Sequence, residues 1–282
     1  MSCCLVMEGG GMRGLFTAGV IDVLLESGVC FDAAVGVSAG AIFGTNIKSG
    51  QAGRVLRFNL RFCRDPRYVS LRSLIRTGDV FGADFCYNQL TYHLDPFDTD
   101  AFARSPMKFY AVCTDLRTGK PYYHLCEKGT PEDMIYIRAS ASMPLVSRTV
   151  IIDGAAYLDG GVADPLPVRF AQGLGYERMV VIRTKPEDYK KSPQKGLFLA
   201  RARYRDYPEF VKTFARRHEI YNDSLEDIRT LQEQGRAFVI APQTMPPAGV
   251  VERNPDRLRR THEAGREEAL RQLDVLRRFM QG

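Results

Sequence analysis

The chain has 282 residues, of which 45% are hydrophobic and 26% are charged, and its formal net charge is +6. This is the composition of an ordinary globular protein, without a low-complexity tract or a repeat. No charge-free apolar run reaches the ~18 residues of a membrane-spanning helix, and the start MSCCLVMEGG lacks the basic and apolar regions of a secretory signal. We therefore expect a cytoplasmic protein.

The seven cysteines form no CxxC pair and no Cys/His cluster along the sequence. Several, such as Cys30 and Cys113, lie in apolar stretches, which is typical of reduced thiols in a core. The sequence also contains no cluster of acidic ligands and no EF-hand loop. We therefore expect neither a metal site nor any other cofactor.

Much of the positive charge is local, in RVLRFNLRFCRDPR from Arg54 and in RARYRDYPEFVKTFARR from Arg201. One interpretation is a pair of solvated helix faces. The other is a surface that meets anionic lipid, which would place the protein peripherally on the inner membrane face. No nucleic-acid-binding motif accompanies the charge, so we do not expect a nucleic acid partner.

The first elements alternate between strands and helices. The apolar run from Cys3 to Met7 predicts a strand, and after EGGGMRG the apolar residues follow helical spacing up to a stop at Gly28. A second buried strand is expected from Ala33 to Val37, followed by GVSAG and another helix. Successive strands joined by helices imply a parallel sheet with helices on its faces.

Later strands are expected from Phe109, around Ile151 and Tyr157, and from Met179. Beyond Lys185 we predict a helical stretch from Tyr204 to Glu233, one more strand from Ala237, and a last amphipathic helix with Asn254 as its cap and Pro255 in its first turn. The inward-facing residues of that helix are expected to be Leu258, Leu270, Leu273, Leu276 and Met280. The predicted division is a domain over residues 3–184 and a helix-rich extension over 185–282.

Gly9, Gly11 and Gly14 follow the first strand with GxGxxG spacing. A dinucleotide site needs an acidic residue at the end of the second strand, but Asp32 precedes that strand and Ser38 follows it. The other use of such a loop is a cluster of backbone N–H groups at a helix start, which attracts negative charge. In acyl transfer that charge is the oxyanion of the tetrahedral intermediate.

The second loop, GVSAG, has the GxSxG pattern of a nucleophile elbow, in which a tight strand-to-helix turn presents the oxygen of Ser38. Gly36 and Gly40 leave room for that turn. Both loops come at the carboxyl ends of their strands, so they share one crevice if the strands are neighbours.

A serine nucleophile needs a base. The four histidines, His93, His124, His218 and His262, lie in no recognisable catalytic context. A carboxylate is the alternative, and VIIDGAAYLDGGVADPLPV contains two candidates. Asp153-Gly154 lies between two apolar runs and reads as a hairpin turn, whereas Asp159 ends the second run without an obvious return partner.

Four elements in order, EGGGMRG, GVSAG, RASASMPLV and DGGVADPLPV, make the chain resemble a patatin-like phospholipase. The resemblance implies an α/β fold in which a mostly parallel sheet is sandwiched by helices. Carried over residue by residue, it implies a nucleophile at Ser38, a dyad aspartate at Asp159 in a DGG motif with Gly160 and Gly161, and an oxyanion loop at Gly9, Gly10, Gly11 and Gly14. The chain has Glu8 where the family usually has Asp, a departure that concerns the packing of the loop.

The resemblance further implies a serine-dependent lipid acyl hydrolase that cleaves carboxylic esters of phospholipid or related lipid through an acyl-enzyme, without histidine. We expect Arg13 to pin the loop or to help hold an acidic head group. The alternative is a non-catalytic lipid- or protein-binding module on the same fold.

Two further segments bear on the site. Residues 54–90 mix arginines with apolar side chains and pass through Gly78 and Gly82, so they form either a lid over an acyl-binding groove or an ordinary packed helix and loop. Ser140 and Ser142 are expected in a packing loop before Pro144.

Overall fold

The computed structural model describes residues 2–194 and 196–281. Within them, eight strands form one mixed sheet in the order β5-β6-β3-β2-β1-β7-β8, with β4 pairing with β3 off this path. The strands are β1 (Cys3–Met7), β2 (Ala33–Val37), β3 (Lys108–Asp115), β4 (Pro121–Cys126), β5 (Val150–Ile152), β6 (Ala155–Asp159), β7 (Arg178–Ile182) and β8 (Ala237–Ile240).

The α-helices are α1 (Leu15–Glu26), α2 (Ala39–Ser49), α3 (Arg54–Phe62), α4 (Leu71–Thr77), α5 (Thr99–Arg104), α6 (Pro131–Ser140), α7 (Val168–Gly173), α8 (Leu197–Arg203), α9 (Pro208–Ala215), α10 (Arg217–Glu233) and α11 (Pro255–Gln281). Two short 3₁₀ turns, η1 (Gly11–Gly14) and η3 (Gly160–Val162), and a π-helix, η2 (Phe85–Leu94), complete the described chain.

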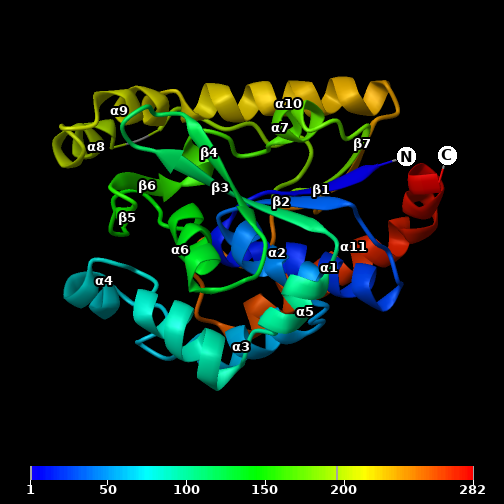
Figure 1. Ribbon diagram of the computed structural model, residues 1–282, viewed down its shortest axis with the longest axis horizontal. Helices are drawn as coiled ribbons and strands as arrows, with labels where there is room; N and C mark the ends of the chain where they lie inside the picture. The colour runs from blue at the N-terminus through cyan, green and yellow to red at the C-terminus, as the bar shows by residue number, and fades with distance from the viewer. Residues whose placement is uncertain (1, 195, 282) are drawn as a thin grey trace.

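The sheet lies between two layers of helices, as Figure 1 shows. Because side chains alternate along a strand, β1 sends Leu5 and Met7 to the layer of α1, α2 and α11, and Cys4 and Val6 to the layer of α7 and α10. Both faces are therefore buried, which explains why β1 and β2 read as continuous apolar runs. The predicted fold class, a mostly parallel sheet sandwiched by helices, is confirmed: β3, β2, β1, β7 and β8 are parallel neighbours.

Strand pairing brings the predicted motifs to one edge of the sheet. β1 pairs with β2 in parallel, with Met7 opposite Gly36, so the two glycine-rich loops emerge side by side. β6 runs antiparallel to β3, with Asp159 opposite Cys113. The hairpin that β6 forms with β5 turns at Asp153 and Gly154, which both have positive φ, as the Asp-Gly pair predicts.

The C-terminal part of the chain, from Lys185 onward, contributes to both faces of the same sheet. β8 pairs with β7, α10 packs on one face, and α11 packs along α1 on the other. Asn254 caps α11 as predicted, because its side-chain oxygen accepts the N–H of Asp256 at 2.9 Å. The division at residue 184 stays a prediction.

Two expectations about the core were wrong. Leu258 and Leu276 of α11 are buried, but Leu270 is 55% exposed, since its position on the helix turns away from α1 and the sheet. Cys30 lies in the exposed turn before β2 rather than in the core, whereas Cys113 is buried in β3.

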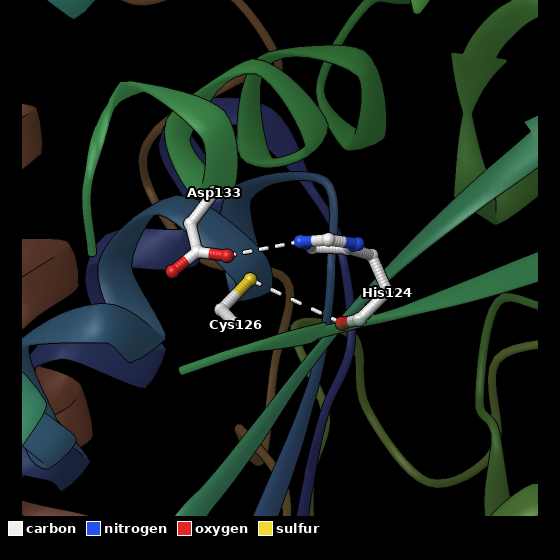
Figure 2. Close-up of side chains that lie close together, drawn as sticks. All are labelled: His124, Cys126 and Asp133. Atoms are coloured by element: carbon white, nitrogen blue, oxygen red, sulfur yellow. Dashed lines mark hydrogen bonds and ion pairs between the residues drawn. The ribbon is translucent and has the colours of Figure 1, made fainter. Parts of the chain in front are cut away.

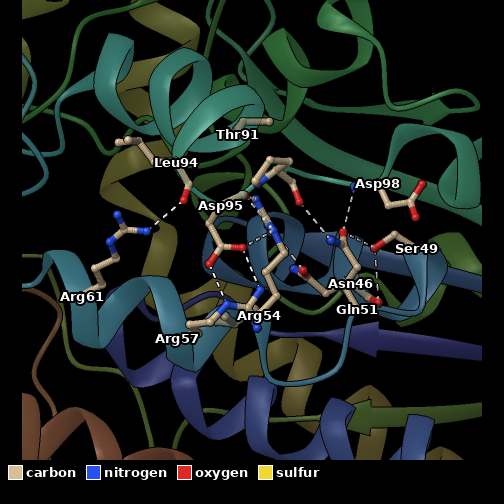
Figure 3. A network of polar contacts seen from close by, with 12 residues as sticks. Asn46, Ser49, Gln51, Arg54, Arg57, Arg61, Thr91, Leu94, Asp95 and Asp98 are labelled. Atoms are coloured by element: carbon tan, nitrogen blue, oxygen red, sulfur yellow. Dashed lines mark hydrogen bonds and ion pairs between the residues drawn. The ribbon is translucent and has the colours of Figure 1, made fainter.

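The basic stretch from Arg54 is attached to the body of the protein by its charges (Figure 3). Arg54 is buried and donates to the backbone carbonyl of Asp95, and Arg57 makes a two-pronged ion pair with the Asp95 carboxylate at 2.8 and 2.9 Å. Arg61 donates to the carbonyl of Leu94. These contacts join α3 to the end of η2. Arg54 is buried there, whereas Arg57 and Arg61 remain exposed to solvent while they make their contacts.

In the part of the chain that the structure describes, no helix has the length and apolar composition to cross a membrane.

Candidate active site

Ser38 stands at the sharp turn between β2 and α2. Its φ of 56° and ψ of −121° are a strained conformation for a residue with a side chain. The carbonyl of Ser38 accepts the N–H groups of Ala41 and Ile42, which starts the helix at once. A side chain at Gly40 would put its Cβ 2.4 Å from the carbonyl oxygen of Met7, so the turn requires glycine there. The local sequence thus produces the predicted elbow geometry.

The side chains of Ser38 and Asp159 meet directly. Ser38 Oγ donates to Asp159 Oδ2 at 2.6 Å, and the two residues are only 7% and 3% exposed. The other carboxylate oxygen, Oδ1, accepts the N–H of Gly161 at 2.8 Å, and the carbonyl of Gly160 accepts the N–H of Asp164. The DGG motif therefore fixes the carboxylate so that its Oδ2 atom faces the hydroxyl of Ser38.

Burial raises the pKa of Asp159 above its ordinary value, although the guanidinium of Arg217 and the hydrogen bonds from Ser38 and Gly161 oppose the shift. A raised pKa makes this carboxylate a stronger base than an exposed aspartate. A carboxylate that is to take a proton from an alcohol needs a pKa shifted in this direction, upward.

The loop from Gly9 to Gly14 lies against the elbow. A Cβ on Gly9 would lie 2.7 Å from the Cβ of Ser38, so only glycine permits this approach. Met12 donates its N–H to the carbonyl of Val250, which anchors the far side of the loop. Among the described residues, no acceptor takes the N–H of Gly10 or Gly11. Two backbone donors therefore remain open beside Ser38.

The buried side chain of Glu8 connects the start of this loop to neighbouring segments. Its carboxylate accepts the N–H of Thr184 at 2.6 Å and the hydroxyl of Tyr221 at 2.8 Å, and it pairs with the ammonium of Lys185. The pKa of Glu8 is lowered although burial opposes this, because Lys185 stabilises the carboxylate. Since Lys185 and Tyr221 belong to the C-terminal part, Glu8 ties the glycine loop to that part.

Two cavities meet at Ser38 and share Gly11, Ser38 and Met143. The first is lined mainly by apolar side chains that include Phe43, Phe58, Phe81, Leu90 and Ile137. Residues 54–90 thus form one wall of an apolar cavity. The second, called the polar cavity below, is lined by charged side chains that include Asp159 and Arg13, and the Nε of Arg13 is buried without a hydrogen-bond partner.

No histidine lines either of these two cavities. His262 is buried against Asp22, linking α11 to α1, and His124 bonds to Asp133 at 2.9 Å. His93 is exposed, and His218 lies on the first turn of α10. The arrangement around Ser38 consequently offers a carboxylate and no imidazole.

The sequence did not predict the cluster of His124, Cys126 and Asp133, because strand β4 and helix α6 bring these residues together only in three dimensions (Figure 2). The carboxylate of Asp133 accepts from His124 through one oxygen and from the N–H groups of Lys128 and Gly129 through the other. Burial raises the pKa of the Cys126 thiol well above its ordinary value. These contacts suit a structural role in closing the turn after β4.

Sequence reasoning missed three residues that contact the site. Ser140 ends α6 instead of lying in a loop, and its Oγ accepts the N–H of Ser38 at 3.0 Å. Arg217 donates from Nε to the carbonyl of Gly161 at 2.8 Å, and Tyr221 bonds to Glu8. Ser140 lies within the quoted RASASMPLV stretch, so that motif was a usable signal; Arg217 and Tyr221 carry no local signal.

Comparison with known proteins gives two family matches. The model of the family described as patatin-like phospholipase matches residues 5–171, and a domain of unknown function, DUF6363, matches residues 207–281. The VipD structure from Legionella pneumophila covers 97% of this chain and 67% of its own, with a TM-score of 0.49 and 15% identity.

Among curated proteins, YjjU of Escherichia coli K12, which is described as uncharacterized, is 33% identical over 195 residues, 67% of this chain and 54% of that protein. An uncharacterized NTE family protein of Mycobacterium bovis is 28% identical over 178 residues, 63% of this chain and 48% of that one. Lysophospholipase nte1 of Aspergillus oryzae is 27% identical over 176 residues, 61% of this chain and 11% of that one. The chain thus spans about half the length, or less, of these relatives. Because the family model covers more than half of the chain and carries the elements that form the crevice, the chain belongs to the patatin-like phospholipase family.

Proposed function

We propose that this protein is a serine-dependent lipid acyl hydrolase that cleaves carboxylic esters with a Ser38–Asp159 dyad. The observation that carries the proposal is the 2.6 Å hydrogen bond from Ser38 Oγ to Asp159 Oδ2, at the junction of an apolar cavity and a polar one. Family membership supports a lipid substrate, as does the lysophospholipase name of one relative.

In the proposed reaction, Ser38 Oγ attacks the ester carbonyl carbon while its proton passes to Asp159 Oδ2. The N–H groups of Gly10 and Gly11 hold the oxyanion, within the loop from Gly9 to Gly14. The carbon–oxygen bond to the leaving alcohol then breaks, and that alcohol takes the proton from Asp159.

Water attacks the acyl-enzyme in the second half of the reaction and gives its proton to Asp159. The bond between Ser38 Oγ and the acyl carbon breaks, the proton returns to Ser38, and the fatty acid leaves. The DGG residues Gly160 and Gly161 keep the carboxylate in place, and the apolar cavity holds the acyl chain through both steps.

We also propose contact with an anionic lipid surface. Leu71 and Ile75 of α4 are 70% and 78% exposed, and Phe198 of α8 is 72% exposed. Arg72 and Arg76 lie within α4, and Arg201 and Arg203 lie within α8. Both helices lie on the left of Figure 1, at the side of the β5–β6 hairpin. Exposed apolar residues beside cations are typical of interfacial contact.

A fluorophosphonate probe tests the proposed chemistry. The wild-type protein should hydrolyse p-nitrophenyl butyrate and take up one phosphonyl group on the peptide that contains Ser38. A folded protein that shows neither turnover nor labelling would instead favour the non-catalytic binding module.

A further inference from the structure

We propose that Lys191 and Arg217, with Arg13, form a head-group site that selects lipids with a net anionic head group. This inference rests on the proposed function, because it concerns the substrate of the same site. The three side chains line the polar cavity that contains Ser38 and Asp159.

The first argument is unbalanced charge. The polar cavity is lined by four cations, Arg13, Lys185, Lys191 and Arg217, and by two carboxylates, Glu8 and Asp159. Lys185 forms an ion pair with Glu8. Among the described residues, none of the other three cations forms an ion pair, so Asp159 is the one carboxylate in this cavity left to face them.

The second argument is the state of these side chains. The Nε atom of Arg13 is buried with no hydrogen-bond partner, although a buried guanidinium donor normally has one. Lys191 is half-buried, and its ammonium lies 5.4 Å from the centre of the Tyr221 ring. Burial lowers the pKa of Lys191 to about 8, and the like charges of Arg217, Lys185 and Arg13 contribute, with Glu8 opposing them. An anion placed among these groups would give the Nε of Arg13 a hydrogen-bond acceptor and would offset the repulsion between the cations around Lys191.

The third argument is position. The apolar cavity and the polar cavity share Ser38, so an ester bound at Ser38 has its acyl chain in one and its alcohol portion in the other. In a phospholipid the alcohol portion carries the phosphate, which suits a cluster of arginine and lysine. A choline or ethanolamine group would bring a further positive charge among the same cations, so phosphatidylglycerol should bind better than phosphatidylcholine.

Lys191 and Arg217 lie outside residues 5–171, and Arg217 lies within residues 207–281, which match the domain of unknown function. The inference therefore gives the C-terminal part a role: it supplies head-group selectivity to a reaction centre built by the N-terminal part.

Binding to an inactive variant tests the site without turnover. Calorimetry on Ser38→Ala would compare monomeric short-chain phosphatidylglycerol and phosphatidylcholine with identical acyl chains. We expect about tenfold tighter binding of phosphatidylglycerol, and loss of that preference on adding Lys191→Gln, since one charge-assisted contact is worth about a factor of ten or more. Lys191→Arg should keep the preference. Lys190→Gln, the same charge change on an exposed neighbour, should also keep it.

Equal binding of the two lipids to Ser38→Ala, or a preference that survives Lys191→Gln, would overturn the proposal. Inorganic phosphate serves as a second probe. If phosphate binds through Lys191 but the lipids bind equally, the cluster is a site for a free anion, and the head-group assignment is wrong. Hydrolysis of p-nitrophenyl butyrate by the wild-type protein and by Lys190→Gln reports the proposed chemistry separately, because this neutral ester has no charged head group. Turnover of this ester together with equal binding of the two lipids would overturn the head-group site and leave the proposed reaction intact.

Discussion

The two parts of the chain contribute to the crevice in different ways. The N-terminal part supplies Ser38, Asp159 and the glycine loop from short motifs at the ends of β1, β2 and β6. The C-terminal part supplies single side chains from α10 and from the segments on either side of it, including Tyr221, Arg217 and Lys191. The comparison teaches that the residues of the proposed chemistry are encoded in local motifs, whereas their support and the proposed head-group selectivity depend on long-range packing.

The largest effect should come from the proposed nucleophile, Ser38. Ser38→Ala should lower kcat for p-nitrophenyl butyrate by roughly 10³-fold or more, because the covalent step is lost. Ser142→Ala is the matched control, since this buried serine donates to the carbonyl of Arg138 rather than to Asp159. If Ser142→Ala abolishes turnover and Ser38→Ala does not, the N-terminal motif has been misassigned.

Asp159→Asn should cost about 10²-fold or more in kcat, because the amide keeps the size of the side chain but cannot take the proton. Wild-type activity should rise with pH through one ionisation above the ordinary ~3.9 of aspartate, since the pKa of Asp159 is raised. Asp153→Asn, at an exposed turn in the same hairpin, is the control and should retain wild-type activity.

The stability of Asp159→Asn provides an independent check. Because the fold raises the pKa of Asp159, the folded state binds this proton more tightly than the unfolded state. The free energy of unfolding contributed by this group therefore falls as pH rises from ~3.9 through the folded-state pKa, and at neutral pH the ionised group is destabilising. Thermal unfolding at pH 7 should show Asp159→Asn at least as stable as wild type. A clear loss of stability would mean that the carboxylate is structural.

The link between the two parts can be broken at Tyr221. Tyr221→Phe removes the hydroxyl that donates to buried Glu8, which should lower the free energy of unfolding by about 1–3 kcal/mol. We expect a loss of activity of about tenfold, because the glycine loop rests on Glu8. Tyr189→Phe is the matched control, since its ring packs against that of Tyr221. Unchanged activity in a destabilised Tyr221→Phe would show that the C-terminal part does not position the loop.

The smallest effect should be at the surface. Ile75→Ser and Phe198→Ser should weaken co-sedimentation with anionic vesicles by about threefold to tenfold each, through loss of inserted apolar area. Hydrolysis of the water-soluble ester should not change. Leu174→Ser is the control. Leu174 is also an exposed apolar residue, 42% exposed, but it follows α7 and belongs to neither of the two helices of the proposed contact surface, α4 and α8. Equal binding of wild type to neutral and anionic vesicles, independent of salt, would remove the proposed electrostatic contact.

The same contrast explains what the sequence predicted. Parallel strands of apolar residues, the Asp153-Gly154 turn and the elbow at Ser38 are local patterns, so they could be predicted before the structure. The bond from Ser140 to the elbow and the pairing of Glu8 with Tyr221 join residues 102 and 213 positions apart. No local pattern encodes such contacts, since they depend on how helices pack onto the sheet.

The error at Leu270 has a related cause. Helical periodicity over α11 identifies an apolar face, but the covered width of that face depends on α1, which contacts only part of the helix. Similarly, the burial of Arg54 was not predicted, because the sequence did not place Asp95 beside it.

The central claim, a dyad that needs no histidine, is tested most directly by kcat/KM for p-nitrophenyl butyrate in single replacements of His93, His124, His218 and His262, measured beside Asp159→Asn and checked for folding by circular dichroism. The account predicts that every folded histidine variant stays within about threefold of wild type while Asp159→Asn loses about 10²-fold or more. A folded histidine variant as inactive as Ser38→Ala would contradict the dyad and indicate a serine–histidine–acid hydrolase.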